Sequence, residues 1–427
     1  MKRFQLLILL SLVLTTTQSL LASTAIKTEI KLINGSYKLF RGGKPYYIKG
    51  AGGVTNIEKL AAYGGNSIRT WSTNENTKAL LDEAYKHGIT VTLGLHVERE
   101  RHGFDYNNKE AVKEQLEKLR QEVLKYKDHP ALLMWGIGNE LNLHYTNPKV
   151  WDAVNEISKM IHEVDPNHLT TTMSAGLHKE QITYINEHCT DLDLMCFQMY
   201  GDLPSLPEKV RAYGWKGAYV VTEWGPTGHW EVPKTLWGAP IEETSSQKAK
   251  VYKERYEASM LTDTAQCVGS YVFLWGQKQE RTPTWYGLFL EGGQETEVID
   301  VMHYLWNGEY PANKAPHIKS LLINDKNAYS SIYVKPGEKV FAKADAFDPE
   351  NENLVVRWEL LPESTDLKEG GDPESRPVAI KGVVDRFTAS EITFSVPKKE
   401  GAYRLFVYIE DGNNNAATGN IPFYVKK

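Results

Sequence analysis

Two glutamates in the sequence each stand at the end of an apolar run, where a pair of carboxyl groups could break a glycosidic bond. Glu140 closes the run Leu-Met-Trp-Gly-Ile-Gly-Asn-Glu, and Glu223 closes the run Tyr-Val-Val-Thr-Glu. In such a pair, a neutral carboxyl group protonates the leaving oxygen while an ionised one attacks or stabilises the sugar carbon. Burial and a neighbouring negative charge both raise a carboxyl pKa, so we predict Glu140 as the acid/base and Glu223 as the nucleophile.

Further polar residues follow other apolar runs and could complete such a site. Tyr200 could donate its hydroxyl to Glu223, and Arg69 could add positive charge beside the same carboxylate. His96 and His178 could contact substrate hydroxyl groups or could pack in the protein. The elements that carry these residues must therefore end at one common edge.

The arrangement of the elements indicates a barrel. Eight short segments rich in β-branched and aromatic residues alternate with amphipathic helical segments, which predicts an α/β fold of the (β/α)8 TIM barrel type. Reactive groups in such a barrel lie at the C-terminal ends of the strands. A doubly wound sheet is the alternative, disfavoured because no glycine-rich phosphate loop follows any strand. The predicted strands are residues 46–50, 67–71, 90–96, 132–139, 169–174, 194–200, 219–224 and 269–275, and the predicted helices include 77–87, 109–126, 150–163, 208–213, 247–262 and 297–306.

A second domain follows a polar stretch that is flanked by prolines at residues 307–316. Alternating runs separated by turn clusters predict an all-β sandwich of immunoglobulin-like type. We therefore expect a signal peptide (1–25), a catalytic barrel (26–312) and an immunoglobulin-like β-sandwich (313–427). Because every candidate catalytic residue precedes the stretch, we expect the sandwich to act as a spacer or scaffold. The predicted runs are 331–334, 339–344, 354–360, 391–396, 403–410 and 421–425.

The first residues have the pattern of a secretory signal. Lys2 and Arg3 precede an apolar run at residues 6–14, and small residues follow before the expected cut. The run is short of the roughly 20 residues that span a bilayer, so we expect export to the periplasm or the outside and no membrane insertion. The net charge of −5 disfavours nucleic acid as a partner.

No metal or other cofactor is expected. The chain has no HExxH motif, and its three cysteines lack the CxxC spacing of a zinc site. Buried positions in the core fit these cysteines better than a disulfide framework. In the second domain, three aspartates could bind calcium, but turn and cap roles are favoured. The cysteines are Cys189, Cys196 and Cys267, and the aspartates are Asp345, Asp348 and Asp411.

The strand ends carry a family resemblance. Asn139-Glu140 after the fourth strand and Glu223 after the seventh resemble the acid/base and nucleophile of clan A glycoside hydrolases, retaining enzymes built on this barrel. The resemblance covers the whole barrel. It implies that Asn139 binds the substrate 2-hydroxyl, that Tyr200 orients the nucleophile, and that Trp275 forms the floor of the −1 sugar site.

Within the clan, the sequence is similar to the bacterial family 158 β-1,3-glucanases, in which a barrel precedes an immunoglobulin-like module. It also resembles the barrel of family 2. Gln198 departs from the pattern of many clan members, which have histidine or asparagine at that place, so the resemblance assigns it no role.

Several aromatic residues could bind sugar rings by stacking. Trp230, Trp237, Trp285 and Tyr286 lie in long segments after the seventh and eighth strands, which a compact domain would rarely fill with exposed aromatics without a ligand. Trp224, next to Glu223, is a further candidate for substrate binding. Core or rim packing is the alternative for Trp224 and equally for Trp71 and Trp135.

These features together predict a secreted, retaining β-glycoside hydrolase that acts on a β-linked polysaccharide, most simply by endo cleavage of β-1,3-glucan. An exo-acting family 2-like β-glycosidase that trims chain ends is the alternative. A non-catalytic carbohydrate-binding barrel is disfavoured because both glutamates are present. Retention requires the two carboxyl groups to stand about 5 to 5.5 Å apart. We expect a monomer.

Overall fold

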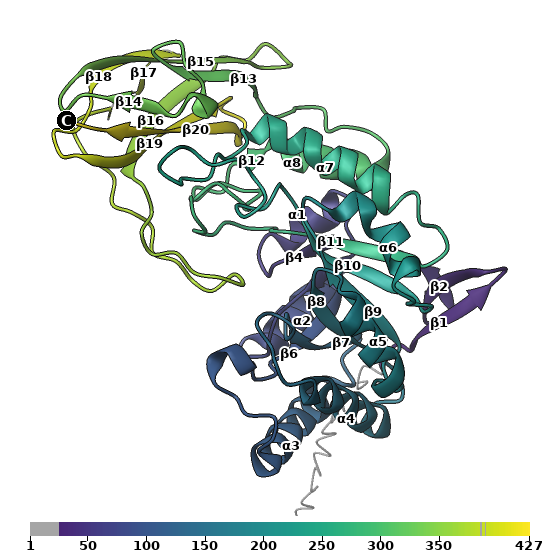
Figure 1. Cartoon of the computed structure of the whole chain (residues 1–427). Helices are drawn as coiled ribbons and strands as arrows, with labels where there is room; N and C mark the ends of the chain where they lie inside the picture. The colour runs from purple at the N-terminus through teal and green to yellow at the C-terminus, as the bar shows by residue number, and fades with distance from the viewer. Residues whose placement is uncertain (1–24, 385–386, 389) are drawn as a thin grey trace, which may run out of the picture.

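The computed structural model describes residues 25–384, 387–388 and 390–427, which form a barrel and a β-sandwich (Figure 1). The predicted signal peptide, residues 1–25, lies outside this range except for its last residue. Among the described residues, no helix is both long and apolar enough to cross a membrane.

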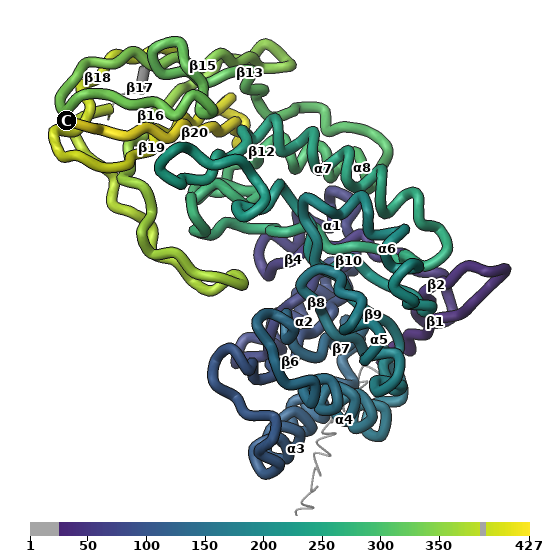
Figure 2. Tube along the Cα trace, in the orientation of Figure 1, coloured from purple at the N-terminus to yellow at the C-terminus, as the bar shows by residue number. Residues whose placement is uncertain are grey.

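Eight parallel strands close into a barrel in the order β10-β11-β4-β5-β6-β7-β8-β9. Figure 2 traces the chain through the barrel into the sandwich. The predicted TIM barrel is thus confirmed, with strand ends shifted by a few residues. Side chains fill the inside and helices cover the outside, which explains why almost every residue of these strands is buried. The strands are β4 (Ile48–Gly52), β5 (Ser67–Arg69), β6 (Thr90–Leu95), β7 (Leu132–Asn139), β8 (Leu169–Ala175), β9 (Leu194–Gln198), β10 (Tyr219–Trp224) and β11 (Cys267–Val272).

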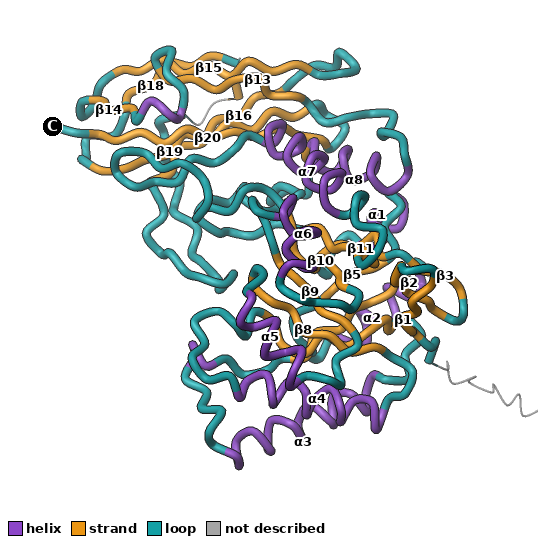
Figure 3. The backbone as a smooth tube through the Cα atoms, turned by 45° about the vertical axis from the view of Figure 1, so that its right-hand side comes forward, coloured by secondary structure: helices purple, strands orange, loops and turns teal. Residues whose placement is uncertain are grey.

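Helices lie between consecutive strands around the barrel (Figure 3). In the fourth helix, Val150, Val154, Ile157 and Ile161 recur at helical spacing and are buried against the strands. The helices are α1 (Ile57–Ala62), α2 (Thr77–Lys86), α3 (Lys109–Tyr126), α4 (Lys149–Val164), α5 (Lys179–His188), α6 (Leu206–Ala212), α7 (Ser245–Ser259) and α8 (Glu297–Asn307), with 3₁₀ turns η1 (Glu100–His102), η2 (Leu203–Ser205) and η3 (Ala328–Ser330).

A small antiparallel sheet that the sequence analysis missed precedes the barrel. Its strands are β1 (Thr28–Ile33), β2 (Ser36–Arg41) and β3 (Lys44–Tyr46). Asn34 and Gly35 join the first two strands, and both have the positive φ that a two-residue hairpin turn requires. Leu39 packs with Ile48 and other residues near the starts of the barrel strands. The sheet therefore covers the N-terminal end of the barrel and leaves the C-terminal end for a site.

The C-terminal residues form two packed sheets, as the predicted sandwich requires. One sheet has the order β12-β20-β19-β16-β17 with β14 beside β20, and the other has the order β13-β15-β18. Ile318 and Val340 from one sheet share a core with Trp358 and Leu405 from the other. The strands are β12 (Glu295–Thr296), β13 (His317–Ile323), β14 (Ile332–Val334), β15 (Lys339–Phe347), β16 (Val355–Pro362), β17 (Phe387–Thr388), β18 (Glu391–Ser395), β19 (Gly401–Glu410) and β20 (Asn415–Val425).

The two domains share a polar junction. The short strand β12, which precedes α8, pairs in parallel with the start of β20, so the sandwich sheet includes residues before the predicted boundary at residue 313. Arg404 of β19 is buried and donates to the Pro240 carbonyl in the barrel and to Glu363 and Asn420 in the sandwich. These contacts fix where the loops of the sandwich meet the barrel.

Candidate active site

A cavity of about 1260 Å³ opens at the C-terminal end of the barrel strands. Glu140 follows β7, Glu223 lies in β10, and Gln198 and Tyr200 lie at the end of β9, and all of them line the cavity. This is the end of the barrel where catalytic groups are expected. The structure thus brings together the two glutamates that the sequence singled out.

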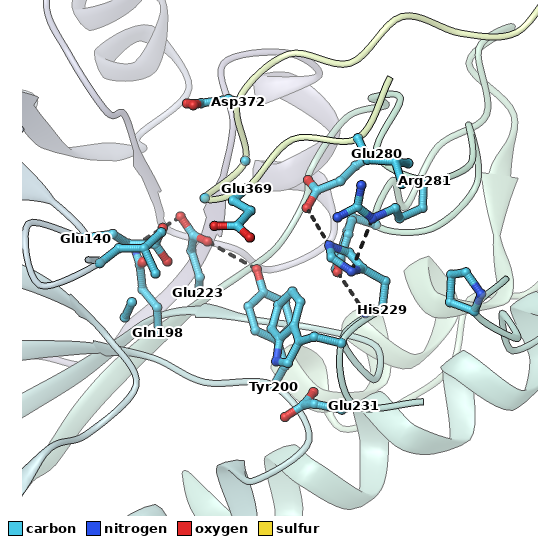
Figure 4. A pocket seen from close by; sticks show the side chains of 18 of the residues that line it. Glu140, Gln198, Tyr200, Glu223, His229, Glu231, Glu280, Arg281, Glu369 and Asp372 are labelled. Atoms are coloured by element: carbon cyan, nitrogen blue, oxygen red, sulfur yellow. Dashed lines mark hydrogen bonds and ion pairs between the residues drawn. The ribbon is translucent and has the colours of Figure 1, made fainter. Parts of the chain in front are cut away.

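The Glu223 carboxylate accepts hydrogen bonds from four side chains, of which Figure 4 shows the one from Tyr200. Arg69 Nη1 (3.0 Å), Trp71 Nε1 (2.9 Å) and Gln198 Nε2 (3.1 Å) donate to its Oε1. The Tyr200 hydroxyl donates to its Oε2 at 3.1 Å. Four donors, one of them cationic, hold this carboxylate in one orientation and stabilise its negative charge.

Arg69 is fully buried and forms an ion pair with Glu223. The same guanidinium donates to the Thr222 carbonyl at 3.0 Å and to Asn139 Oδ1 at 2.7 Å. The structure thus places Arg69 beside Glu223, as predicted. Loss of one partner of a buried pair leaves an unpaired charge, which typically costs about 3 to 5 kcal/mol.

Glu140 has a very different environment from Glu223. Its carboxyl group makes no hydrogen bond or ion pair with any residue that the structure describes. Burial raises its pKa to about 7, with a further contribution from the negative charge of Glu223, against the opposing charges of Arg69 and Arg99. The two carboxyl groups therefore have the complementary properties of a general acid and a nucleophile.

The backbone around Glu140 adopts an uncommon conformation. Gly138 has φ of 71° and Glu140 has φ of 53°, in the region that residues other than glycine rarely occupy. A Cβ atom on Gly138 would lie 2.6 Å from Leu141 Cδ1, so glycine is needed there. The Glu140 amide donates to the Met173 carbonyl at 2.9 Å. The strain thus falls where β7 turns its last side chains into the cavity.

Asn139 and Gln198 are tied to the same network. Asn139 Oδ1 accepts from Arg69 Nη2 and from Gln198 Nε2, both at 2.7 Å. The Asn139 amide nitrogen has no acceptor among the described residues and lies on the cavity wall. It is therefore free to donate to a substrate hydroxyl, as the clan resemblance implies. Gln198, for which the resemblance gave no role, orients both Asn139 and Glu223.

An aromatic wall stands beside Glu223. Tyr200 is in edge contact with Trp230, Phe273 and Tyr286 at ring separations of 5.5, 6.4 and 5.7 Å. Burial, followed by the charge of Glu223, raises the pKa of Tyr200 well above its ordinary value, so its hydroxyl stays protonated and can donate. Trp71 packs edge-on against Phe273 on the same wall.

Three tryptophans predicted to bind substrate are instead buried and do not line the cavity. Trp224 packs against Tyr252 and Tyr256. Trp275 lies beyond the end of β11, packs between Phe289 and Trp306, and has only 1% of its surface exposed. Trp285 is equally buried, and its indole donates to the Thr227 carbonyl. Because none presents a free face, the prediction that they stack on sugar is wrong.

The other aromatic candidates do line the cavity. Trp230 is 54% exposed, and Tyr286 and Trp237 also contribute to the lining. Trp237 also contacts Tyr333 and Tyr424 of the sandwich. The long loop after β10 is thus the main source of exposed aromatic surface at the site.

The histidine candidates divide between the cavity and the surface. His178 lines the cavity, exposed, with its ring nitrogen 3.1 Å from the Ala175 carbonyl. His96 is also exposed but is not part of the cavity lining, and its ring lies 3.7 Å from Glu98. His178 therefore lies where it could contact a substrate in the cavity, and the substrate contact of His96 stays a prediction.

The remaining predictions concern the cysteines and the aspartates. The three cysteines are free and buried, as expected. Asp348 and Asp411 accept backbone N–H bonds within their own turns, as expected, and lie with Glu352 in a group whose carboxylate oxygens are within 4.8 Å of one another. Asp345 is not part of that group.

Sequence reasoning missed two parts of the site. Trp71 comes two residues after Arg69, just past the end of β5, and that position was the available signal for its bond to Glu223. Residues 363–365, 367 and 369–372 of the sandwich also line the cavity, a contribution that the expected role of spacer or scaffold did not include. No local pattern in the sequence marks these residues as part of the site.

The barrel matches a known family model. Residues 72–226, which include Glu140 and Glu223, match the model described as glycosyl hydrolases family 2, TIM barrel domain. The predicted resemblance to the family 2 barrel and the presence of a glycoside hydrolase domain are confirmed, and the resemblance to family 158 stays a prediction. A comparison with curated proteins finds no match.

Solved structures share the fold at low sequence identity. β-Glucuronidase 2 of Bacteroides uniformis, bound covalently to cyclophellitol-6-carboxylate aziridine, has a TM-score of 0.50 and 16% identity over 93% of this chain and 48% of its own. A putative β-galactosidase of Bacteroides fragilis has a TM-score of 0.50 and 13% identity over 94% and 58%. β-Glucuronidase of Bifidobacterium dentium, complexed with coumarin-3-O-glucuronide, has a TM-score of 0.51 and 18% identity over 66% and 50%. This chain thus spans about half of their length.

The raised pKa of Glu140 predicts a pH dependence. A general acid must be protonated, so activity should fall as the pH rises through about 7, the pKa of this carboxyl group. Glu140→Gln should abolish that alkaline limb in the profile of kcat/KM for an aryl glycoside with an activated leaving group. An alkaline limb that is unchanged in Glu140→Gln would assign the titration to another group.

The positions of the tryptophans predict two kinds of variant. Trp230→Ala should raise KM for oligosaccharides by about fivefold, the effect of losing about 1 kcal/mol of stacking. Trp275→Ala should lower the free energy of unfolding by about 3 to 5 kcal/mol, because it empties a buried site. Steady-state kinetics and denaturant titration separate the two effects. A raised KM in Trp275→Ala, with the free energy of unfolding unchanged, would show that Trp275 contacts substrate in the cavity.

Proposed function

We propose that this chain is a retaining β-glycosidase, with Glu140 as the acid/base and Glu223 as the nucleophile. The observation that carries the proposal is the contrast between the two carboxyl groups in one cavity. Glu140 has a pKa raised to about 7 and no hydrogen-bond partner among the described residues, whereas Glu223 accepts from four donors. Export through the predicted signal peptide belongs to the same proposal.

The reaction follows from these roles in two balanced steps. Glu223 attacks the anomeric carbon as the glycosidic bond breaks, and Glu140 gives its proton to the leaving oxygen. The sugar is then esterified to Glu223, and Glu140 is ionised. Glu140 next takes a proton from water, whose oxygen attacks the same carbon and releases Glu223 as a carboxylate.

The neighbours of Glu223 serve both steps. Arg69 and Trp71 donate to Oε1 and Tyr200 donates to Oε2, so the carboxylate is already oriented before substrate arrives. Preorganised donors of this kind need no rearrangement as charge moves in the transition state. The free amide of Asn139 supports the implied contact with the hydroxyl group next to the anomeric carbon.

Apart from Lys234, the lysine and arginine side chains on the cavity wall are already neutralised, which favours a neutral sugar. A uronic acid carboxylate needs a cation that is not already neutralised. The arginines on the cavity wall and Lys278 each have a carboxylate partner, and Lys234 has none within ion-pair distance among the described residues. The pairs are Arg99 with Asp372 at 3.8 Å, Lys278 with Glu280 at 2.7 Å, and Arg281 with Glu374 at 3.0 Å.

Exo action is favoured over endo action. The family model that matches residues 72–226 is that of family 2. The resemblance to that family in the sequence implied a β-glycosidase that trims chain ends. Endo cleavage of β-1,3-glucan is the second candidate, favoured by the cavity of about 1260 Å³, which is larger than the roughly 300–1,000 Å³ of typical small-molecule sites.

Two variants test the catalytic assignment. Glu223→Gln should lose nearly all activity because it removes the nucleophile. Glu140→Ala should keep turnover of substrates with activated leaving groups, which need little protonation, and should recover with added azide. Proton NMR of the first product should show the β-anomer, as retention requires. Wild-type rates in Glu223→Gln, or mainly α-anomer in the wild type, would contradict the assignment.

The paired cations predict the charge of the substrate. Among aryl β-glycosides, the best neutral sugar of a glucoside, galactoside, mannoside and xyloside panel should exceed the glucuronide in kcat/KM by about tenfold or more. Lys234→Ala is the control variant, because Lys234 is the cation on the cavity wall that has no ion-pair partner. This variant should leave the order of substrates unchanged. A glucuronide that ranks first would exclude the neutral-sugar proposal.

A further inference from the structure

The segment that follows β16 leaves the sandwich and reaches the mouth of the barrel (Figure 1). We call residues 363–374 the sandwich loop. Residues 363–365, 367 and 369–372 line the same cavity as Glu140 and Glu223. Figure 4 shows Glu369 and Asp372 on this loop near the two glutamates. Leu367 is 55% exposed and presents an apolar side chain on the cavity wall.

One anchor of the sandwich loop is Glu374, whose side chain is fully buried. Its carboxylate accepts from the Arg281 backbone at 2.6 Å and from Arg281 Nη1 at 3.0 Å. The Lys368 amide donates to the same carboxylate at 3.0 Å, and Arg281 Nη2 donates to the Lys368 carbonyl at 3.1 Å. Arg281 follows β11, so this anchor holds the loop on that side of the barrel.

A second anchor lies at the tip of the sandwich loop, on the other side of the mouth. Asp372 lies between Arg99 (3.8 Å), Arg101 (3.4 Å) and His102 (3.5 Å), which all follow β6. Glu369 pairs with His144, which follows β7, at 2.7 Å. The loop therefore spans from the segment after β11 to the segments after β6 and β7.

The tip fits the barrel closely. Gly370 has φ of 59°, and a Cβ there would lie 2.7 Å from Arg101 Nη2 and 2.8 Å from Leu143 Cδ2. Gly371 also has a positive φ, and its carbonyl accepts from Lys278 at 3.0 Å. Only glycine combines this backbone with so close an approach. The contact between the tip of the sandwich loop and the barrel is thus specific.

The position of the loop bears on the shape of the substrate site. In the closed barrel, β4 and β5 lie between β11 and β6, so the loop crosses the mouth on the side of those two strands. On the rim after β8, β9 and β10, the described residues of the sandwich loop make no hydrogen bond or ion pair with His178, Asp202 or Trp230; their contacts lie after β6, β7 and β11. A polysaccharide that runs through a cleft needs both sides open.

We infer that the sandwich loop closes one end of the substrate cleft and thereby makes this enzyme cleave at chain ends. The inference rests on the proposed glycosidase function and assigns its mode of action to a segment of the second domain. Anchored at both ends by ion pairs, the loop is a fixed wall, so a chain can enter only with its terminal sugars first.

Product lengths test the inference. The probes are reducing-end-labelled hexasaccharides, and the corresponding polysaccharides, of β-1,3-glucan, β-1,4-mannan, β-1,4-galactan and β-1,4-xylan. The wild-type enzyme should shorten its preferred chain stepwise from one end. Replacement of residues 366–373 by a short glycine–serine turn should give products of mixed length from the first minutes. The ratio of polysaccharide to aryl-glycoside turnover should rise by about tenfold, the scale of an opened subsite.

Point variants distinguish a change in the position of the sandwich loop from a loss of folding. Gly370→Val should shift the product lengths in the same direction, because its side chain would collide with Arg101 and Leu143. Gly412→Val is the matched control in the sandwich, with φ of 86° and no atom within 4 Å of an added Cβ, and should keep wild-type product lengths. Asp372→Asn tests the tip anchor in case the larger changes prevent folding, which melting curves would reveal.

The outcomes distinguish the two proposals. If aryl β-glycosides are turned over and natively folded loop variants give wild-type product lengths, the inference about the loop is wrong and the glycosidase function stands. Mixed product lengths from the wild-type enzyme would also overturn it. If no β-glycoside in the panel is turned over by the wild-type enzyme, the glycosidase function fails, and the inference fails with it.

Discussion

The carboxylate of Glu223 is the point on which the geometry of the site depends. Its four donors come from the ends of two strands, with Arg69 and Trp71 at β5 and Gln198 and Tyr200 at β9. β5 and β9 are not neighbours in the barrel, so only closure of the whole sheet brings these side chains together. A buried arginine and glutamate are costly to separate, and this pair therefore fixes the strand ends relative to one another.

The same pair sets the conditions for Glu140. Because Arg69 and its neighbours use their hydrogen bonds on Glu223 and Asn139, the carboxyl group of Glu140 has burial and the nearby negative charge without a compensating donor. The surroundings thus raise the pKa of Glu140, whereas hydrogen-bond donors hold the carboxylate of Glu223 in one orientation. The positive φ of Gly138 and Glu140 is the backbone strain that accompanies this placement.

The sandwich takes part in the site because the junction between the domains is polar and specific. Strand β12 adds a barrel segment to the sandwich sheet, and Arg404 joins Glu363 to the Pro240 carbonyl. Glu363 is the first residue of the sandwich loop, so the junction determines where that loop begins. Asn420 of the sandwich donates to Glu242 of the barrel, which forms a buried ion pair with Lys248. This is a further contact between the two domains.

The sequence alone determined the elements of the barrel and the positions of Glu140 and Glu223, because alternation of strand and helix patterns is local and a parallel barrel places strand ends at one edge. It also indicated a second all-β domain. The small N-terminal sheet was missed, although its Asn34-Gly35 turn was a local signal. Tertiary structure alone decided which tryptophans face the cavity, because Trp230 and Trp275 both lie beyond strands and differ only in the path of the chain around them. It also decided that Asp372 meets Arg99 and Arg101, since that contact joins residues about 270 positions apart and depends on how two domains pack, which no local periodicity records.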